Sequence, residues 1–322
     1  MLSGRQLILA TRPFAKEVRW KSWYYVISTF LLLCLCLTST LLNFPILIKI
    51  LLSFFAALLI VRMFAIYHDY VHEAILCNSI LAKTVFTAFG LYVLAPISIW
   101  RLSHDHHHHH NSKLSHTSIG SYPVFTKSKF EKSSLNEKRH YLFIRHPLTI
   151  GFGYIFTFLH GMCIQSLQHN FKKHLDSLLA LIFHFVGQIL LICFFGWQAF
   201  LFFSLIPHLV SGCIGSYLFY VQHNFPGVIF KVNNEWTYEG AALESSSYLE
   251  VNAFLRWVTA NIGYHHIHHL NPRIPFYRLQ EVMGHYKELQ APKKSTFMPL
   301  DIAACLKLKV WDNEKKQMVG LT

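Results

Sequence analysis

Residues 45–72 read PILIKILLSFFAALLIVRMFAIYHDYVH, an apolar run that ends in two histidines. The run is long enough to cross the hydrocarbon core of a bilayer as an α-helix, which takes about 20 apolar residues. Lys49 near its start and Arg62 near its finish can extend their charged groups to the two membrane surfaces. His68 and His72 follow the run four residues apart, so a continuing helix would present both on one face. We therefore expect a membrane-spanning helix with a pair of histidines at its end.

The composition of the whole chain supports a membrane protein. Of 322 residues, 53% are hydrophobic and only 14% are charged, whereas a soluble domain carries about 25% charged residues. The same numbers exclude a disordered chain. The seven cysteines have no regular spacing and stand mostly in apolar runs, which excludes a disulfide scaffold. Lys and Arg exceed Asp and Glu by 13, a surplus that is typical of cytoplasmic loops.

Three other apolar runs can cross a membrane. With the first, they predict four spans, at about 24–42, 45–64, 178–195 and 198–219. Segments 80–99 and 148–167 are interrupted by polar residues, glycine or proline, and we expect them to be interfacial or re-entrant. The charge rule places both termini and the polar segments 100–147 and 220–322 in the cytoplasm. The predicted fold is an all-α polytopic membrane protein, one unit over 1–322 with four transmembrane helices, interfacial helices and a cytoplasmic histidine-rich cap.

Histidine is the most unusual feature of the composition, with 22 residues against 16 acidic residues. It is costly in hydrocarbon and is the commonest metal ligand. Three clusters follow apolar segments, with spacings of three and four residues that put the side chains on one face of a helix. The clusters are His68 and His72; His104, His107 and His108; and His265, His268 and His269. Eight convergent imidazoles exceed the four to six or so ligands of one ion, so we expect two neighbouring ions.

The ligand type restricts the metal. All-imidazole sites suit zinc, copper, iron or nickel, and redox iron with O2 is the best fit for a site beside apolar helices. Asp69 and Asp105 stand next to these histidines and are candidates to orient them through their second nitrogens. The second cluster has an alternative register, since His106, His109 and His110 have the same spacing.

Three motifs resemble those of the membrane fatty acid desaturases, near the delta-12 and omega-3 acyl-lipid branch. They are HDYVH at 68–72, WRLSHDHHHHHN at 100–111 and GYHHIHHLNPRIPFYRL at 263–279. The resemblance implies a non-haem di-iron centre held by the three motifs, and O2-dependent removal of two hydrogens from an acyl chain. It favours His104, His107 and His108 over the alternative register, because Trp100, Arg101 and Ser103 precede them. It also implies a further histidine ligand between the last span and the third motif, for which the candidate is His223.

The resemblance has consequences for the partners. The substrate is expected to be a fatty acyl lipid or acyl thioester in an apolar tunnel between the spans, and no nucleic acid is expected. No HPGG haem motif is present, so the electron donor, of the ferredoxin or cytochrome b5 type, should be a separate protein. An acidic donor or lipid headgroups would suit a basic face formed by Lys127, Lys129, Lys132, Arg145 and Arg273. Tyr70 and Val71 replace the small residues of many delta-12 members, which leaves the double-bond position open.

Two other functions compete with desaturation. A membrane hydroxylase, ketolase or alkane oxygenase would use the same histidines but insert oxygen into a lipid, carotenoid or alkane. A histidine-rich metal-binding protein or transporter would need polar ligands at mid-bilayer, whereas these clusters follow the spans. The expected location is a membrane with the active site on its cytoplasmic side, and the bacterial inner membrane is favoured over the endoplasmic reticulum.

Overall fold

The structure is a computed structural model that describes residues 2, 4–114, 122–232 and 234–321. Four helical stretches within it are long and apolar enough to cross a membrane, which confirms the predicted number. They are α2(Arg19–Ser39), α3(Ile46–Val71), α10(Leu175–Phe195) and the continuous stretch Trp197–Val221, made of α11(Trp197–Ala199), η3(Phe200–Leu205) and α12(Ile206–Val221). The first span begins earlier than predicted, and α3 continues past residue 64 to include His68. The first histidine pair therefore lies at the end of a rigid helix.

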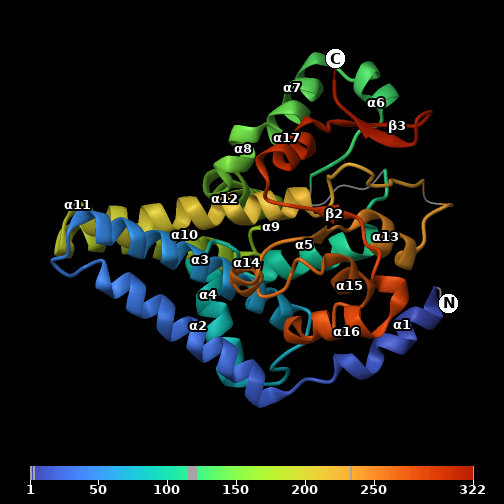
Figure 1. The fold of residues 1–322 in the computed structure, drawn as a ribbon. Coiled ribbons are helices and arrows are strands. Elements are labelled where there is room, and N and C mark those ends of the chain that lie inside the picture. Colours follow the sequence, from blue (N-terminus) through green and yellow to red (C-terminus); the bar gives the residue numbers. More distant parts are fainter. Residues whose placement is uncertain (1, 3, 115–121, 233, 322) are drawn as a thin grey trace.

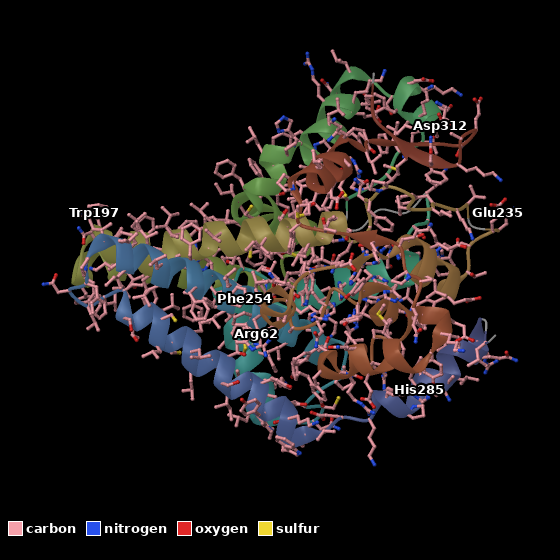
Figure 2. All side chains as sticks on the ribbon, viewed as in Figure 1. Arg62, Trp197, Glu235, Phe254, His285 and Asp312 are labelled. Carbon is pink, nitrogen blue, oxygen red and sulfur yellow. The ribbon has the colours of Figure 1, made fainter. Side chains whose placement is uncertain are left out.

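The long helices form two hairpins whose tight connections lie at the same end of the molecule (Figure 1). Trp197, which begins α11, is exposed at this tip, while Glu235 and Asp312 lie at the opposite end (Figure 2). Tryptophan is common at the membrane–water interface. The two hairpins therefore share one membrane orientation, and the shorter helices gather beyond their open ends.

A bent helix pair follows α3. α4(Ile80–Tyr92) and α5(Ile97–His110) meet at 89°, and they would make a fifth span only if the pair were counted as one. The bend contains Leu94, whose φ is +58°, and Pro96, which precedes α5. At the start of α5, the Ser98 amide donates to Asp176 at the beginning of α10 over 3.0 Å. This contact fixes the direction of the helix that carries the second histidine cluster.

The segment 148–167 is also helical, and it packs against the last span. It comprises α8(Pro147–Gly151), the π-helical η2(Tyr154–Ile164) and the first residues of α9(Gln165–Asn170). A Cβ atom added to Gly212 of α12 would lie only 2.6 Å from the Tyr154 nitrogen, so glycine permits this close approach. Described helices in this segment fall short of the length of a span, and its re-entrant or interfacial placement stays a prediction.

The remaining elements form the cap and the N-terminal arm. They are α1(Arg5–Thr11), η1(Arg12–Ala15), α6(Lys127–Lys132), α7(Leu135–Ile144), α13(Tyr238–Ser245), α14(Ala253–Val258), α15(His265–Leu270), η4(Phe276–Arg278), α16(Leu279–His285), η5(Lys287–Leu289) and α17(Pro299–Lys307). Two short sheets supplement the predicted helices: β1(Tyr248–Leu249) pairs in parallel with β2(Lys294–Ser295), and β3(Val310–Asp312) pairs antiparallel with β4(Gln317–Val319). Thr11 accepts a hydrogen bond from Asn271 over 3.0 Å, so the N-terminal arm supports the helix that carries the third cluster.

The expectation that Arg62 extends to the membrane surface is wrong. Its side chain turns inward (Figure 2) and is 3% exposed. It donates to Thr29 Oγ1 of α2 over 3.1 Å and to the Trp257 carbonyl, and its guanidinium carbon lies 4.5 Å from the centre of the Trp257 ring. These partners satisfy the charge inside the protein, so Arg62 joins the first hairpin to the cap.

Candidate metal centre

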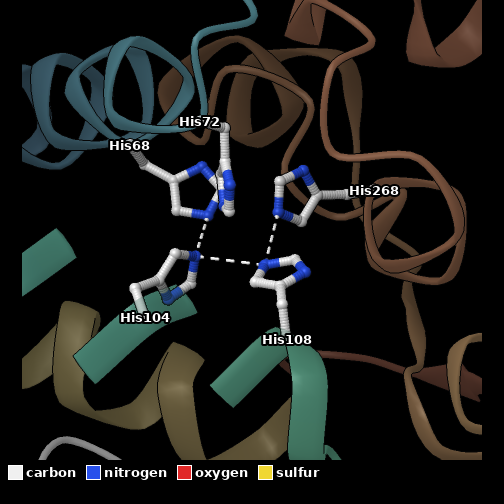
Figure 3. A group of neighbouring side chains, drawn as sticks. All are labelled: His68, His72, His104, His108 and His268. Carbon is white, nitrogen blue, oxygen red and sulfur yellow. Dashed lines mark hydrogen bonds between the residues drawn. The ribbon is translucent and has the colours of Figure 1, made fainter. Parts of the chain in front are cut away.

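Five of the predicted histidines form one group, drawn in Figure 3. His68 and His72 come from the end of α3, His104 and His108 from α5, and His268 from α15. One nitrogen of each ring lies within 4.8 Å of those of the other four. The Nε2 atoms are separated by 2.7 Å between His104 and His68, 3.2 Å between His108 and His104, and 3.1 Å between His268 and His108. The spacing of four residues on α3 and α5 produces this convergence, because it aligns two rings on each helix.

The other four predicted histidines form a second group. His107 comes from α5, His265 and His269 from α15, and His223 from just after α12. His223 lies at the centre, with its Nε2 2.9 Å from that of His107 and 2.8 Å from that of His265. The Nε2 atoms of His269 and His265 are 3.0 Å apart. α5 and α15 each contribute to both groups, so the two groups are neighbours.

The structure distinguishes the two registers of the second cluster. His104, His107 and His108 are in the groups, whereas His106, His109 and His110 are not. The His106 and His110 rings stack on each other with centroids 4.1 Å apart. His109 is exposed and donates from Nδ1 to the Asp105 carbonyl over 2.7 Å. The register favoured by the family resemblance is therefore the one that converges.

The donor set fits metal ions. Burial lowers the pKa of His223 to about 4, and burial together with neighbouring histidines holds the pKa of His268 and His269 well below the usual 6.5. These rings are therefore neutral at pH 7. A neutral imidazole carries one N–H and one lone pair, and several lone pairs that face a common centre are a ligand set for a cation. Each group can hold one metal ion with imidazole ligands alone, which suits zinc, copper, iron or nickel.

Some of the imidazole rings are also oriented by contacts to Nδ1, the ring nitrogen on the side away from the group. The buried Asp69 carboxylate lies 3.3 Å from His68 Nδ1 through one oxygen, and the other accepts from the Phe276 amide over 2.6 Å. His223 donates from Nδ1 to the Ser245 carbonyl over 3.0 Å. The sequence contained no signal for this carbonyl, because any residue can supply one.

Asp105 differs from Asp69. It is exposed, and its side chain is not brought into contact with the grouped rings among the described residues. His265 and His268 have no hydrogen-bond partner at Nδ1 in the described part of the chain. The expected carboxylate or carbonyl partners are therefore found for only part of the set.

A cavity adjoins both groups. Five of the grouped histidines line it: His68, His104, His107, His223 and His265. Its lining also includes aromatic and aliphatic side chains of α3, η2 and α12, namely Phe64, Phe158, Leu218 and Phe219. The histidines thus share a cavity wall with apolar side chains.

One residue of the predicted basic face, Arg145, is not on the surface. Lys127, Lys129, Lys132 and Arg273 are exposed, but Arg145 is 0% exposed. Its position at the end of α7, facing α12 and the C-terminal segment, buries the side chain. Arg145 therefore cannot contribute to a docking surface for a partner protein.

Apart from His223, the described histidines outside the three motifs lie outside the two groups. They include His160, which is exposed, His174, which bonds Ser98, and His184 and His208 within the spans. The His184 Nε2 atom lies 2.6 Å from the Tyr154 hydroxyl and 2.7 Å from the Gln188 amide nitrogen. These contacts are those of side chains that pack within and between helices.

Comparisons with known proteins agree with the geometry. The family described as fatty acid desaturase matches residues 41–300. A fatty acid desaturase of Bacillus subtilis is 30% identical over 275 residues, which cover 85% of this chain and 78% of the relative. A chloroplastic omega-6 fatty acid desaturase of Glycine max is 26% identical over 80% of this chain, and an sn-1 oleoyl-lipid 12-desaturase of Synechocystis is 25% identical over 62%. The matches span 61% of the Glycine max protein and 57% of the Synechocystis protein, less than two thirds of their lengths.

Proposed function

We propose, from the premise that this chain belongs to the fatty acid desaturase family, that it introduces a double bond into a membrane-associated acyl chain at two iron ions. The overall reaction removes two hydrogens from adjacent methylene groups. Together with two electrons from a donor and two protons, they reduce O2 to two molecules of water. The observation that carries the proposal is the pair of all-imidazole groups beside a cavity that apolar side chains also line.

The nine histidines divide between the two ions. We assign one ion to His68, His72, His104, His108 and His268, and the other to His107, His223, His265 and His269. When bound, the iron pair would supply the oxidation of an unactivated C–H bond by O2. The chain supplies neutral rings, excludes bulk water by burying them, and limits which carbon of the substrate can approach.

Aromatic residues position both the substrate and the ligands. Trp100 stacks on His104 with centroids 4.6 Å apart and on Phe219 of α12 with centroids 5.5 Å apart. Trp100 and Phe219 both line the cavity. An acyl chain in this cavity would therefore contact the same stack that orients a ligand ring. Holding the reacting atoms in place accounts for a large share of the rate in such reactions.

The remaining assignments concern the orientation of the protein in the membrane, its electron donor and its location. We place the histidine end of the molecule on the cytoplasmic side, because the basic segments lie there and cytoplasmic loops are rich in Lys and Arg. A separate ferredoxin or cytochrome b5-type protein would supply electrons. The exposed Lys127, Lys129 and Lys132 suit an acidic partner. The bacterial inner membrane is the proposed location.

The test compares two neighbouring histidines of α15. His268→Ala should abolish unsaturated product and lower bound iron, because His268 belongs to a group. His266→Ala should keep both, because His266 lies outside the groups and bonds the Leu289 carbonyl over 3.2 Å. Both variants would be expressed in a host with saturated and monounsaturated lipids, followed by fatty-acid profiling, metal analysis and measurement of O2 dependence. Product mass separates loss of two hydrogens from gain of one oxygen, and active protein without iron would refute the proposal.

A further inference from the structure

The N-terminal arm, residues 5–18, contacts two of the chain segments that carry predicted metal ligands. It lies beside α16 (Figure 1), bonds the residue that follows α15, and ends next to the loop that follows α3. Leu7 and Phe14 anchor it, because they are 1% and 8% exposed and belong to the main hydrophobic core. The arm is therefore a fixed part of the fold that adjoins both the third and the first histidine motif.

The contacts with the third motif begin at the end of α15. Asn271, the residue directly after this helix, donates to Thr11 Oγ1 over 3.0 Å, and Thr11 is 0% exposed. Arg278 donates to the Pro13 and Lys16 carbonyls over 3.2 Å each. Asn271 and Thr11 are 260 residues apart in the chain, so these bonds hold a tertiary arrangement and not a local turn.

Tyr277 connects the arm to the first motif. Its hydroxyl accepts from the Val18 amide over 2.9 Å. The preceding residue, Phe276, donates its amide to Asp69 over 2.6 Å, and Asp69 contacts His68. A short path of bonded residues therefore leads from the arm to a ligand of the five-histidine group drawn in Figure 3.

The arm also supports the loop that follows His72. In this loop Glu73, Leu76 and Asn78 have φ angles of +57°, +53° and +59°. Residues other than glycine keep such a conformation only where the surrounding structure imposes it. The Glu17 carboxylate, whose side chain is 18% exposed, accepts from the Leu76 amide over 2.8 Å. The bond satisfies a backbone donor inside the strained loop, so Glu17 stabilises the path of the chain beyond α3.

We propose that the N-terminal arm positions the ligands of the five-histidine group, while the four-histidine group formed by the other ligands is held without it. α15 contributes to both groups, so the difference lies in their other members. The arm joins α15 to α3, which carries His68 and His72 of the five-histidine group. The four-histidine group is fixed by α13, which packs against α15 and whose Ser245 carbonyl accepts from His223. Among the described residues, no hydrogen bond joins residues 5–18 to α5, α13 or His223.

This inference rests on the proposed function and adds Thr11, Glu17 and Tyr277 to its metal site as positioning residues. Their hydrogen bonds go to the backbone or to a neighbouring side chain, and none of the three belongs to either histidine group. Without these bonds, α3 and α15 would be free to shift relative to each other. The five-histidine group, which needs both helices, should then lose affinity for its ion while the other ion stays bound.

The test measures bound metal and needs no turnover. A double variant, Glu17→Ala with Tyr277→Phe, removes the acceptors for the Leu76 and Val18 amides. Purified wild type and variant would be titrated with iron(II) in the absence of O2, and the iron per chain and its affinity determined. We expect two tightly bound ions in the wild type and one in the variant, whose second ion should bind about 10-fold more weakly or worse, as for other residues that orient ligands.

A matched control removes the same kind of contact elsewhere in the molecule. The Tyr141 hydroxyl accepts from the Phe125 amide over 3.2 Å and donates to the Lys309 carbonyl, so it also joins distant segments. Tyr141→Phe should lower the Tm and keep both ions at wild-type affinity. Glu17→Gln retains an oxygen that can accept from the Leu76 amide, and it should restore the affinity that Glu17→Ala loses.

Retention of both ions at full affinity by the double variant, even at a lower Tm, would overturn the proposal and leave the arm a structural element only. Loss of both ions together, or an equal loss in Tyr141→Phe, would overturn the selective assignment to the five-histidine group. Should the double variant fail to fold, Glu17→Ala alone is expected to weaken one ion, and unchanged affinity in it would refute the role of the arm. The inference can fail while desaturation stands, and a protein that loses one ion as expected but forms no unsaturated product would refute only the proposed function.

Discussion

Histidines in the cap and histidines in the spans are both buried, but their ring nitrogens face different atoms. In the cap, nitrogen faces nitrogen, as between His104 and His68 at 2.7 Å. In the spans, His184 Nε2 faces the Tyr154 hydroxyl at 2.6 Å and the Gln188 amide nitrogen at 2.7 Å, which can both donate to it. A lone pair that already accepts hydrogen bonds needs no metal. The facing partner, more than burial or the number of histidines, distinguishes a candidate ligand from a packing residue.

The largest expected effect comes from adjacent residues of α5. His108→Ala removes a ring from the five-membered group and should reduce desaturation by more than about 100-fold, because changes outside the ligand set already cost about 10- to 100-fold. Bound iron should fall by about one ion per chain. His109→Ala alters an exposed ring outside both groups and should leave activity and iron within about twofold of wild type. Fatty-acid profiling and metal analysis measure both, and equal losses in the two variants would break the comparison.

The next effect concerns the two aspartates beside the histidines. Asp69→Asn keeps the size of a buried side chain that contacts His68 and the Phe276 amide, but removes its charge. We expect a loss of about 10- to 100-fold in activity or iron affinity. Asp105→Asn, at an exposed position, should have little effect. Steady-state rates and iron titration of both variants provide the check, and a larger loss at Asp105 would favour the sequence-based pairing over the observed geometry.

These pairs also show how far the sequence could predict the site. Helical spacing placed eight histidines on three faces, and the family resemblance added His223; the structure brings all nine together. Spacing is local, so it could be read directly. The Ser245 carbonyl could not be predicted, because a backbone acceptor has no sequence signature and depends on how the cap folds over α12. Asp105 could not be separated from Asp69 without knowing which side of each helix is buried.

The fold was predictable to a similar extent. Length and hydropathy identify the four spans, because a bilayer imposes both. The predicted ends of the spans differ from the observed ones, since α3 continues past residue 64 into the cap, where packing replaces lipid. Arg62 and Arg145 were assigned to surfaces because charge is normally solvated. Their actual environments depend on contacts with Trp257 and with Asn224, which are distant in the sequence.

Removal of the metal ions should lower the thermal stability of the protein. Chelation would leave nine neutral rings facing one another, and the protein would lose the free energy of metal binding that favours the folded state. We expect the Tm to fall by several degrees on iron removal and to recover on reloading. His108→Ala should show a smaller fall, because one group is already impaired. Thermal unfolding with and without chelator measures this, and an unchanged Tm in wild type would indicate that the rings are satisfied without metal.

The smallest effect on metal is expected in the spans. His184→Ala removes the acceptor for Tyr154 and Gln188, and an unsatisfied buried group costs about 1–3 kcal/mol, so the Tm should fall. Iron content should stay at the wild-type value, since His184 belongs to neither group. Tyr154→Phe removes one donor and leaves Gln188 to satisfy His184, so its Tm should fall less. Metal analysis beside thermal unfolding separates the two kinds of histidine, because loss of iron from His184→Ala would mean that hydrogen-bonded nitrogens in the spans also support the metal centre.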